Sequence, residues 1–106
     1  LQNIGGTARF TGAVTATTLS AGSTVANVSL TGTGTAITNA VAFANDGTLT
    51  IGDGDAETYA YTGGLTTTGV GSTVTLHGDI SSTDQGITLG AVTLGGHTGV
   101  DPKGVV

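Results

Sequence analysis

The sequence predicts an all-β chain that folds as a slice of a parallel β-solenoid (β-helix), in which successive coils stack along one axis. The main observation is a repeated triplet, in which a hydroxyl residue lies between two apolar residues and glycine follows closely. The four copies are Val28-Ser29-Leu30, Leu49-Thr50-Ile51, Val74-Thr75-Leu76 and Val92-Thr93-Leu94. Such alternation places apolar residues on one face of a strand and hydroxyls on the other. The central residues are 21, 25 and 18 positions apart, and recurrence near twenty residues is typical of a solenoid.

The composition supports the same fold class. The 106 residues include 20 glycines and 23 threonines, but one glutamate, one lysine, one arginine and no methionine. Threonine suits a pleated strand, glycine suits turns, and the good helix formers are scarce. Disorder is not expected, because only 8% of residues are charged and the mean hydropathy is positive. With four aromatic residues, we expect a thin, layered core of small aliphatic side chains.

Alternating apolar and hydroxyl residues predict the strands in chain order. We expect strands at residues 8–19, 25–30, 36–44, 48–51, 58–62, 65–68, 72–76, 79–82 and 87–94. The first is broken at Gly12 and the last turns a corner at Gly90. Residues 36–44 are also compatible with a short helix, although a strand fits the neighbouring segments better.

Turn residues separate these strands. Asn45-Asp46-Gly47 predicts a tight turn, since Asp-Gly accepts positive backbone torsions. We expect one all-β repeat module at residues 1–96 and a loose tail or connection at residues 97–106. The tail holds the only proline, Pro102, which lacks a backbone donor and does not suit a central strand.

Two other architectures share this pattern. A β-sandwich also has strands every eight to twelve residues. A filament subunit that lends a strand to its neighbour would also be strand-rich, because exposed strand edges recruit partners. In that case residues 1–10 are the best candidate donor strand, with Leu1, Ile4 and Phe10 as its anchors.

The loop at Gly52-Asp53-Gly54-Asp55 is a candidate calcium site. Asp53, Asp55 and Glu57 lie close together, with Asp46 nearby, and calcium prefers several oxygen ligands in a glycine-bearing loop. The alternative is a solvated turn in which aspartate forms hydrogen bonds with its own backbone. No other cofactor is expected.

Two further groups of residues suit a binding or catalytic role. Tyr59 and Tyr61 alternate, so both rings lie on one face of a strand, either as a platform for sugar rings or as part of the core. His77, Asp79 and His97 could form a zinc or acid–base site, but as isolated residues at turns they favour a surface position. No Gly-x-Ser-x-Gly elbow or phosphate loop is present, and we expect that the chain is not an enzyme.

The stretch from Asn45 to Thr68, NDGTLTIGDGDAETYAYTGGLTTT, together with residues 72–94, resembles the repeat segments of giant bacterial surface adhesins of the filamentous-haemagglutinin and autotransporter type. The resemblance extends over residues 8–96 and lies in low-complexity phrases. It implies a parallel β-helix that is exported to the cell surface and serves as a stalk, adhesin or fibre. The implied partners are neighbouring repeats or further copies of the same protein, extracellular matrix and glycans.

Charge and hydropathy exclude other classes of partner. The formal net charge is −5, with Arg9 and Lys103 as the strong cations, so no basic patch for nucleic acid can form. No apolar run approaches the length of a membrane span, and we expect no membrane insertion. There is no cysteine, so neither a disulfide framework nor a thiolate metal site is possible. The sequence starts at Leu1 without methionine and has no basic-then-apolar signal sequence, which predicts a mature product or an excised fragment of a longer protein.

Overall fold

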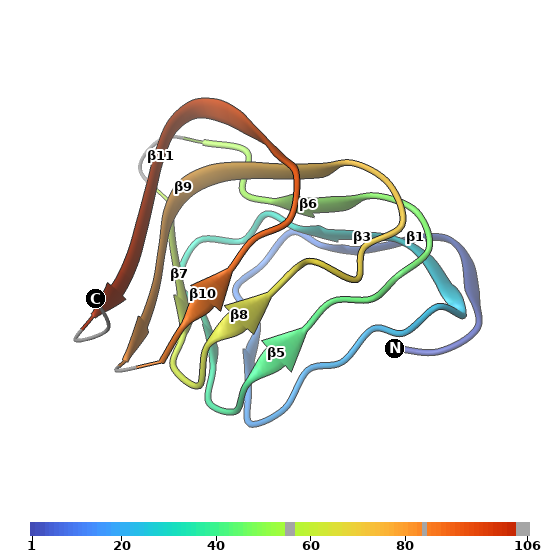
Figure 1. The fold of residues 1–106 in the computed structure, drawn as a ribbon, viewed down its shortest axis with the longest axis horizontal. Helices are drawn as coiled ribbons and strands as arrows, with labels where there is room; N and C mark the ends of the chain where they lie inside the picture. Colours follow the sequence, from blue (N-terminus) through green and yellow to red (C-terminus); the bar gives the residue numbers. More distant parts are fainter. Residues whose placement is uncertain (55–56, 84, 104–106) are drawn as a thin grey trace.

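The chain forms a parallel β-solenoid of about four turns, as the repeated triplets predict (Figure 1). The computed structural model describes residues 1–54, 57–83 and 85–103, with side chains as far as residue 94. No helix occurs among these residues. Each coil passes through three sheets in turn, and the next coil stacks its strands on those of the coil before.

The strands are short, and their bounds follow the alternating segments of the sequence. Within the described residues they are β1 (Ile4–Phe10), β2 (Thr15–Ala16), β3 (Val25–Leu30), β4 (Thr35–Ile37), β5 (Val41–Ala42), β6 (Leu49–Ile51), β7 (Thr58–Tyr61), β8 (Leu65–Thr66), β9 (Val74–Thr83), β10 (Ile87–Thr88) and β11 (Val92–Lys103). The segment that could have been a short helix is instead the two strands β4 and β5.

Three parallel sheets run along the solenoid. The first sheet contains β1, β3, β6, the start of β9 and the start of β11. The second sheet contains β2, β4, β7 and the later parts of β9 and β11. The third sheet contains β5, β8 and β10, which lie side by side in Figure 1. Every strand pairing in the described part of the chain is parallel, so the β-sandwich alternative, which is antiparallel, is wrong.

The register of the first sheet aligns the four triplets. Ser29 pairs with Thr50, Thr50 with Thr75, and Thr75 with Thr93, so the spacings of 21, 25 and 18 residues are the lengths of successive coils. A further copy precedes them, because residues 8–10 pair with residues 28–30. The central residue of this copy is Arg9 rather than a hydroxyl residue, so a search for a hydroxyl residue between two apolar ones does not find it.

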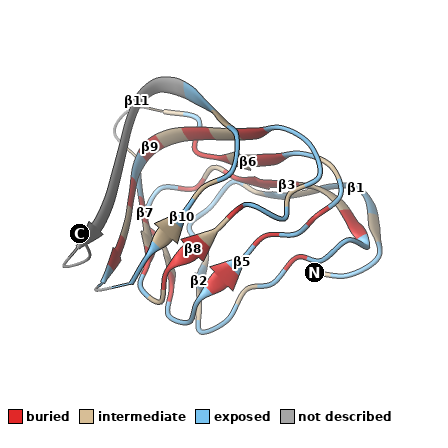
Figure 2. Cartoon of the chain, in the orientation of Figure 1, coloured by how far each residue is buried: buried red, intermediate tan, exposed pale blue. Residues whose placement is uncertain are grey.

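The core is a stack of aliphatic and aromatic rows inside the three sheets. In the first sheet Leu30, Ile51 and Leu76 occupy equivalent positions in successive coils, and each is fully buried (Figure 2). The same row begins at the half-buried Phe10 and ends at Leu94, which is 61% exposed. The row is therefore covered from both sides in the middle of the solenoid and open at its C-terminal end.

Glycine makes the corner between the first and second sheets. Gly52 and Gly78 both have φ of +86°, a left-handed conformation that other residues rarely adopt. They follow the second and third triplets, as the sequence predicts. The third coil is longer than the second because residues are added at this corner: Leu30 pairs with Ile51, 21 positions on, but Thr35 pairs with Tyr59, 24 positions on.

A buried asparagine holds the corner between the third and first sheets. The Asn45 side chain has no exposed surface, and its Nδ2 donates to the carbonyls of Ala26 at 3.0 Å and of Thr48 at 2.8 Å. Asn27 joins the same coils, because its Oδ1 accepts from the Thr48 backbone N–H at 2.9 Å. The expected turn at residues 45–47 is present, and the side-chain amides of Asn45 and Asn27 join it to the preceding coil.

Two expectations about the ends of the chain need correction. β11 continues to Lys103 and pairs with β9, so residues 97–103 belong to the solenoid and are not a loose tail; residues 104–106 lie outside the described part. Pro102 is tolerated because β11 is an edge strand. At the other end, β1 pairs with β3 of its own chain, so the expected donor strand is occupied in this structure.

Candidate functional site

The outer face of the first sheet is a surface of hydroxyl groups. One row consists of Ser29, Thr50, Thr75 and Thr93, which the register brings to equivalent positions in four coils. Strands in a sheet lie about 4.8 Å apart, so the hydroxyls repeat at that interval along the axis. Thr48 and Thr73 are exposed on the same face, two residues before Thr50 and Thr75. The row is exposed at Thr93, half-buried at Thr50 and Thr75, and buried at Ser29, which is 9% exposed.

A shallow hollow of about 400 Å³ lies on this face, over the first three coils. Its lining residues are polar apart from Val28 and include Arg9, Ser29, Thr50 and Asp53. Arg9 and Asp53 bring opposite charges to this surface. The hollow could accept a polar ligand, with hydroxyls and charged groups as its hydrogen-bonding partners.

Glu57 organises the acidic loop next to this hollow. Its Oε1 accepts hydrogen bonds from the backbone N–H of Asp53 at 2.6 Å, the backbone N–H of Gly54 at 2.8 Å and the hydroxyl of Tyr59 at 3.1 Å. One carboxylate therefore holds both sides of the loop together. The loop is a turn in which a carboxylate accepts hydrogen bonds from the backbone, but the acceptor is Glu57 and not an aspartate bonded to its own backbone, as the turn alternative expected.

Asp53 and Glu57 shift each other's protonation in opposite directions. A side-chain hydrogen bond with Glu57, followed by the negative charge of Glu57, raises the pKa of Asp53 above its ordinary value. Burial acts to raise the pKa of Glu57, but the hydrogen bonds from Asp53, Gly54 and Tyr59 outweigh burial, and the pKa of Glu57 is lowered. Glu57 is therefore the more acidic member of the pair.

We expect Glu57 to make the stability of the protein depend on acidity. Because its pKa is lowered on folding, the stabilisation that it gives is complete above its ordinary pKa of 4.5 and is lost as the pH falls through its lower value in the folded state. Asp53 acts in the opposite sense, so the measurement uses Asp53→Asn as the parent. Its melting temperature should fall on acidification below about pH 4.5, whereas Asp53→Asn/Glu57→Gln should lose this dependence. Equal acid profiles for the two variants would contradict the role of Glu57.

The calcium site stays a prediction. The structure brings Asp53 and Glu57 together, whereas Asp55 lies outside the described residues. Among the residues that the structure describes, no three acidic or histidine side chains form a group that could hold a metal ion. A rise in melting temperature on adding calcium that disappears in Asp53→Ala/Asp55→Ala would support the site, and an unchanged melting temperature of the parent would exclude it.

Tyr59 and Tyr61 share one face of β7, as the sequence predicts, but that face points into the core. Tyr59 is 1% exposed and Tyr61 is 0% exposed. Neither ring offers a surface on which a sugar could stack, so the glycan platform expected at these two residues is wrong and the alternative of a core position is correct. Aromatic rings fit here because Thr35 and Ile37, in the coil before, are the smaller residues on which they stack.

The two tyrosine hydroxyls differ, and their removal should have opposite effects. The Tyr61 hydroxyl is buried with no hydrogen-bond partner among the described residues, while the Tyr59 hydroxyl donates to Glu57 at 3.1 Å. An unpartnered buried hydroxyl is costly and a hydrogen-bonded one is stabilising. We expect Tyr61→Phe to raise the free energy of unfolding by about 1 kcal/mol and Tyr59→Phe to lower it by a similar amount. Urea unfolding measures both, and a loss of stability in Tyr61→Phe would contradict this account.

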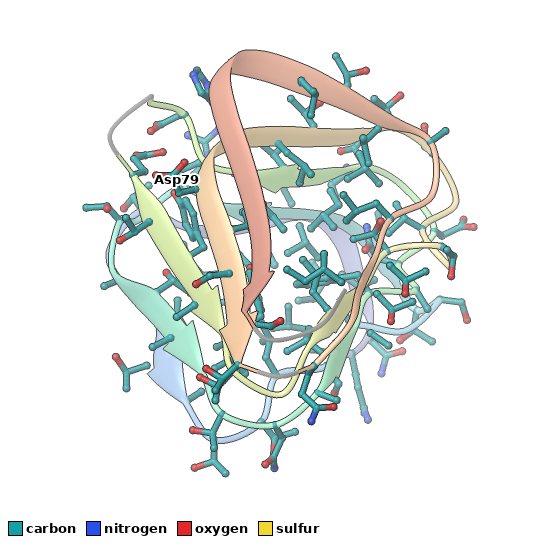
Figure 3. All side chains as sticks on the ribbon, turned by 60° about the vertical axis from the view of Figure 1, so that its left-hand side comes forward. Asp79 is labelled. Atoms are coloured by element: carbon teal, nitrogen blue, oxygen red, sulfur yellow. The ribbon has the colours of Figure 1, made fainter. Side chains whose placement is uncertain are left out.

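Two of the three residues of the candidate histidine site, His77 and Asp79, lie at the corner after the third triplet. His77 is half-buried and Asp79 is exposed, and they flank Gly78 on β9. Figure 3 labels Asp79, whose backbone N–H donates to the Glu57 carbonyl at 2.8 Å. The backbone carbonyl of His77 lies against Gly52, so this corner and the acidic loop are neighbours. The His97 side chain lies outside the described part of the chain.

Register, rather than residue type, reveals Arg9 as a member of the candidate site. The sequence shows it only as one of two strong cations, whereas the structure places it at the N-terminal end of the hydroxyl row, next to Ser29. The available signal was its position between Ala8 and Phe10, 20 residues before Ser29.

Comparison of the chain with models of protein families, with curated proteins and with solved structures gave no match. In the part of the chain that the structure describes, no helix is long and apolar enough to cross a membrane.

Proposed function

We propose that this chain is a structural and adhesive module of a bacterial surface protein or fibre, exposed outside the cell. The observation that carries the proposal is the uninterrupted parallel stack of the first sheet, from β1 to β11. Backbone ladders along one axis make a stiff rod, and repeat architectures of this kind use their extended surfaces for binding. The family resemblance in residues 8–96 points the same way.

The outer hydroxyl row is the adhesive surface in this proposal. Thr50, Thr75 and Thr93 lie at the spacing of the strands and are accessible enough to form hydrogen bonds with a repetitive partner, such as extracellular matrix or glycans. The hollow beside Arg9 adds charged groups to the same face. The module acts through binding and mechanical support, and catalysis has no role in the proposal.

Labelling of intact cells and an adhesion assay test the two parts of the proposal. Antibodies to the purified chain should label the surface of intact bacteria that encode it. Beads coated with the chain should bind immobilised matrix proteins or glycans, and Thr50→Glu/Thr75→Glu should reduce bead binding at least tenfold.

The control variant carries the same change on another sheet. Thr66 and Thr88 are also neighbouring threonines, paired between β8 and β10, and Thr66→Glu/Thr88→Glu should leave bead binding intact. Labelling only after the cells are permeabilised would overturn the proposed location, and equal binding by both variants would overturn the proposed adhesive surface.

A further inference from the structure

We propose that a second copy of this chain stacks head to tail on the first, with β11 of one copy pairing in parallel with β1 of the next. The first sheet then continues from one molecule to another. This inference rests on the proposed function as a structural module and names one partner for it. The joint would place residues 92–94 against residues 8–10, in the register that already joins residues 8–10 to residues 28–30.

The backbone of the first sheet has a direction, which the printed hydrogen bonds define. Inward-facing residues direct their N–H and C=O groups to the following coil: the N–H of Val28 donates to Thr48, and the carbonyl of Leu30 accepts from Gly52. Outward-facing residues direct theirs to the preceding coil, as Thr31 donates to the carbonyl of Phe10. The two ends of the solenoid therefore present different and complementary groups.

This rule specifies the hydrogen bonds of the joint. At the end formed by β11, Val92 and Leu94 direct their N–H and C=O groups outward along the axis. At the end formed by β1, Thr7 and Arg9 direct theirs the opposite way. Stacking in register would let Val92 and Leu94 donate to the carbonyls of Thr7 and Arg9, while Arg9 and Thr11 donate to the carbonyls of Val92 and Leu94. These bonds repeat the pattern that already joins successive coils of one chain.

The apolar side chains at the two ends also match. Leu94 is 61% exposed although it occupies the same row as the buried Leu76. In the joint it would cover the half-buried Phe10 of the next copy, and Val92 would cover Ala8. Edge strands with open backbone groups and exposed apolar residues recruit further strands, and a head-to-tail contact that does not close makes a filament.

The second sheet contributes less to the joint. Pro102 pairs with Ser82 and, by the same alternation, its missing N–H lies on the open edge. At the other end, the register of β1 against β3 shifts between Ile4 and Thr7. Only residues 7–10 of β1 therefore form a regular edge. The first sheet is therefore the expected contact between copies.

Cysteine cross-linking tests the register directly, because the chain has no cysteine of its own. In the joint, Arg9 and Thr93 of neighbouring copies lie on adjacent strands, about 4.8 Å apart, which is within the range of about 4.4–6.8 Å that a disulfide spans. Within one copy they are four coils apart, about 19 Å, so they cannot pair. Oxidised Arg9→Cys/Thr93→Cys should give a ladder of dimers, trimers and higher species on a non-reducing gel.

The matched control moves one cysteine to another sheet. Thr88 is exposed on β10, and Arg9→Cys/Thr88→Cys should give no such ladder. Equal ladders from both variants, or none from either, would overturn the proposed joint. Neither result bears on the adhesive surface, which the bead assay tests separately.

A single substitution tests the same contact without cross-linking. Leu94→Lys places a charge in the joint at a position that is exposed in the single chain, while Thr73→Lys adds the same charge on an exposed outward position of the coil before. By sedimentation at millimolar concentration, the parent chain and Thr73→Lys should form large species and Leu94→Lys should remain monomeric. A monomeric parent chain would overturn the proposal.

Discussion

Replacement of Gly52 by alanine is expected to destabilise the solenoid by at least about 3 kcal/mol. Two costs add at this corner. Gly52 has φ of +86°, which strains any residue with a Cβ, and a Cβ built there lies 2.0 Å from the carbonyl oxygen of His77 in the next coil. Since that oxygen belongs to the backbone, the two coils must move apart to make room. Urea unfolding of Gly52→Ala against the parent measures the loss.

Gly54 provides the control within the same loop. Its φ is not in the left-handed region, and a Cβ there would meet Glu57 at 3.5 Å, an ordinary contact. Gly54→Ala should therefore be neutral or stabilise by less than about 1 kcal/mol, because it reduces the freedom of the unfolded chain. Comparable losses in the two variants would show that the loop, and not the left-handed corner, is sensitive.

Truncation of Leu76 to alanine is the second change with a large expected effect. Leu76 is fully buried in the row that also contains Leu30 and Ile51. The coils on both sides hold its neighbours in place, so the structure cannot collapse into the space that is left. Removal of a buried leucine side chain costs about 2–5 kcal/mol, part of it for the cavity. The shift in the free energy of unfolding measures this cost.

Leu94 belongs to the same row and is the matched control. Because it is 61% exposed, Leu94→Ala should cost less than about 1 kcal/mol in a dilute, monomeric sample. A loss at Leu94 as large as that at Leu76 would mean that something covers the C-terminal end even at low concentration. The pair therefore also reports on the openness of that end.

The sequence predicts the first sheet well, because a period of two residues decides which side chains face the core. Thr50 pairs with Thr75, 25 residues later in the sequence, and Thr75 pairs with Thr93, 18 residues later. The stack is therefore predictable from the sequence although the spacing is unequal. The reason is that the differences lie in the corners. The ladder fixes the register of the triplets, whereas a corner has no such constraint and can change length.

Other features depend on contacts that a pattern does not encode. Alternation predicts that Tyr59 and Tyr61 lie on the same side of β7. It does not predict whether that side faces the core or the solvent, and therefore whether the two rings are exposed. The role of Glu57 depends on the path of the loop, which brings the backbone of Asp53 to its carboxylate. β11 extends as far as Lys103 because β9 is long enough to pair with it up to that residue. This extension results from stacking between coils and has no local signal in the sequence.

The short range of the strand pairings has a mechanical consequence. In the first sheet the paired triplets are separated by only one coil of the sequence, from Ser29 to Thr50 and onward to Thr93. A pull on one end would therefore detach the outermost coil while the remaining coils keep their own contacts. Each detached coil of roughly 20 residues would lengthen the chain by about 70 Å. Under tension the protein would therefore extend in steps, and the unfolding of each coil would absorb mechanical work.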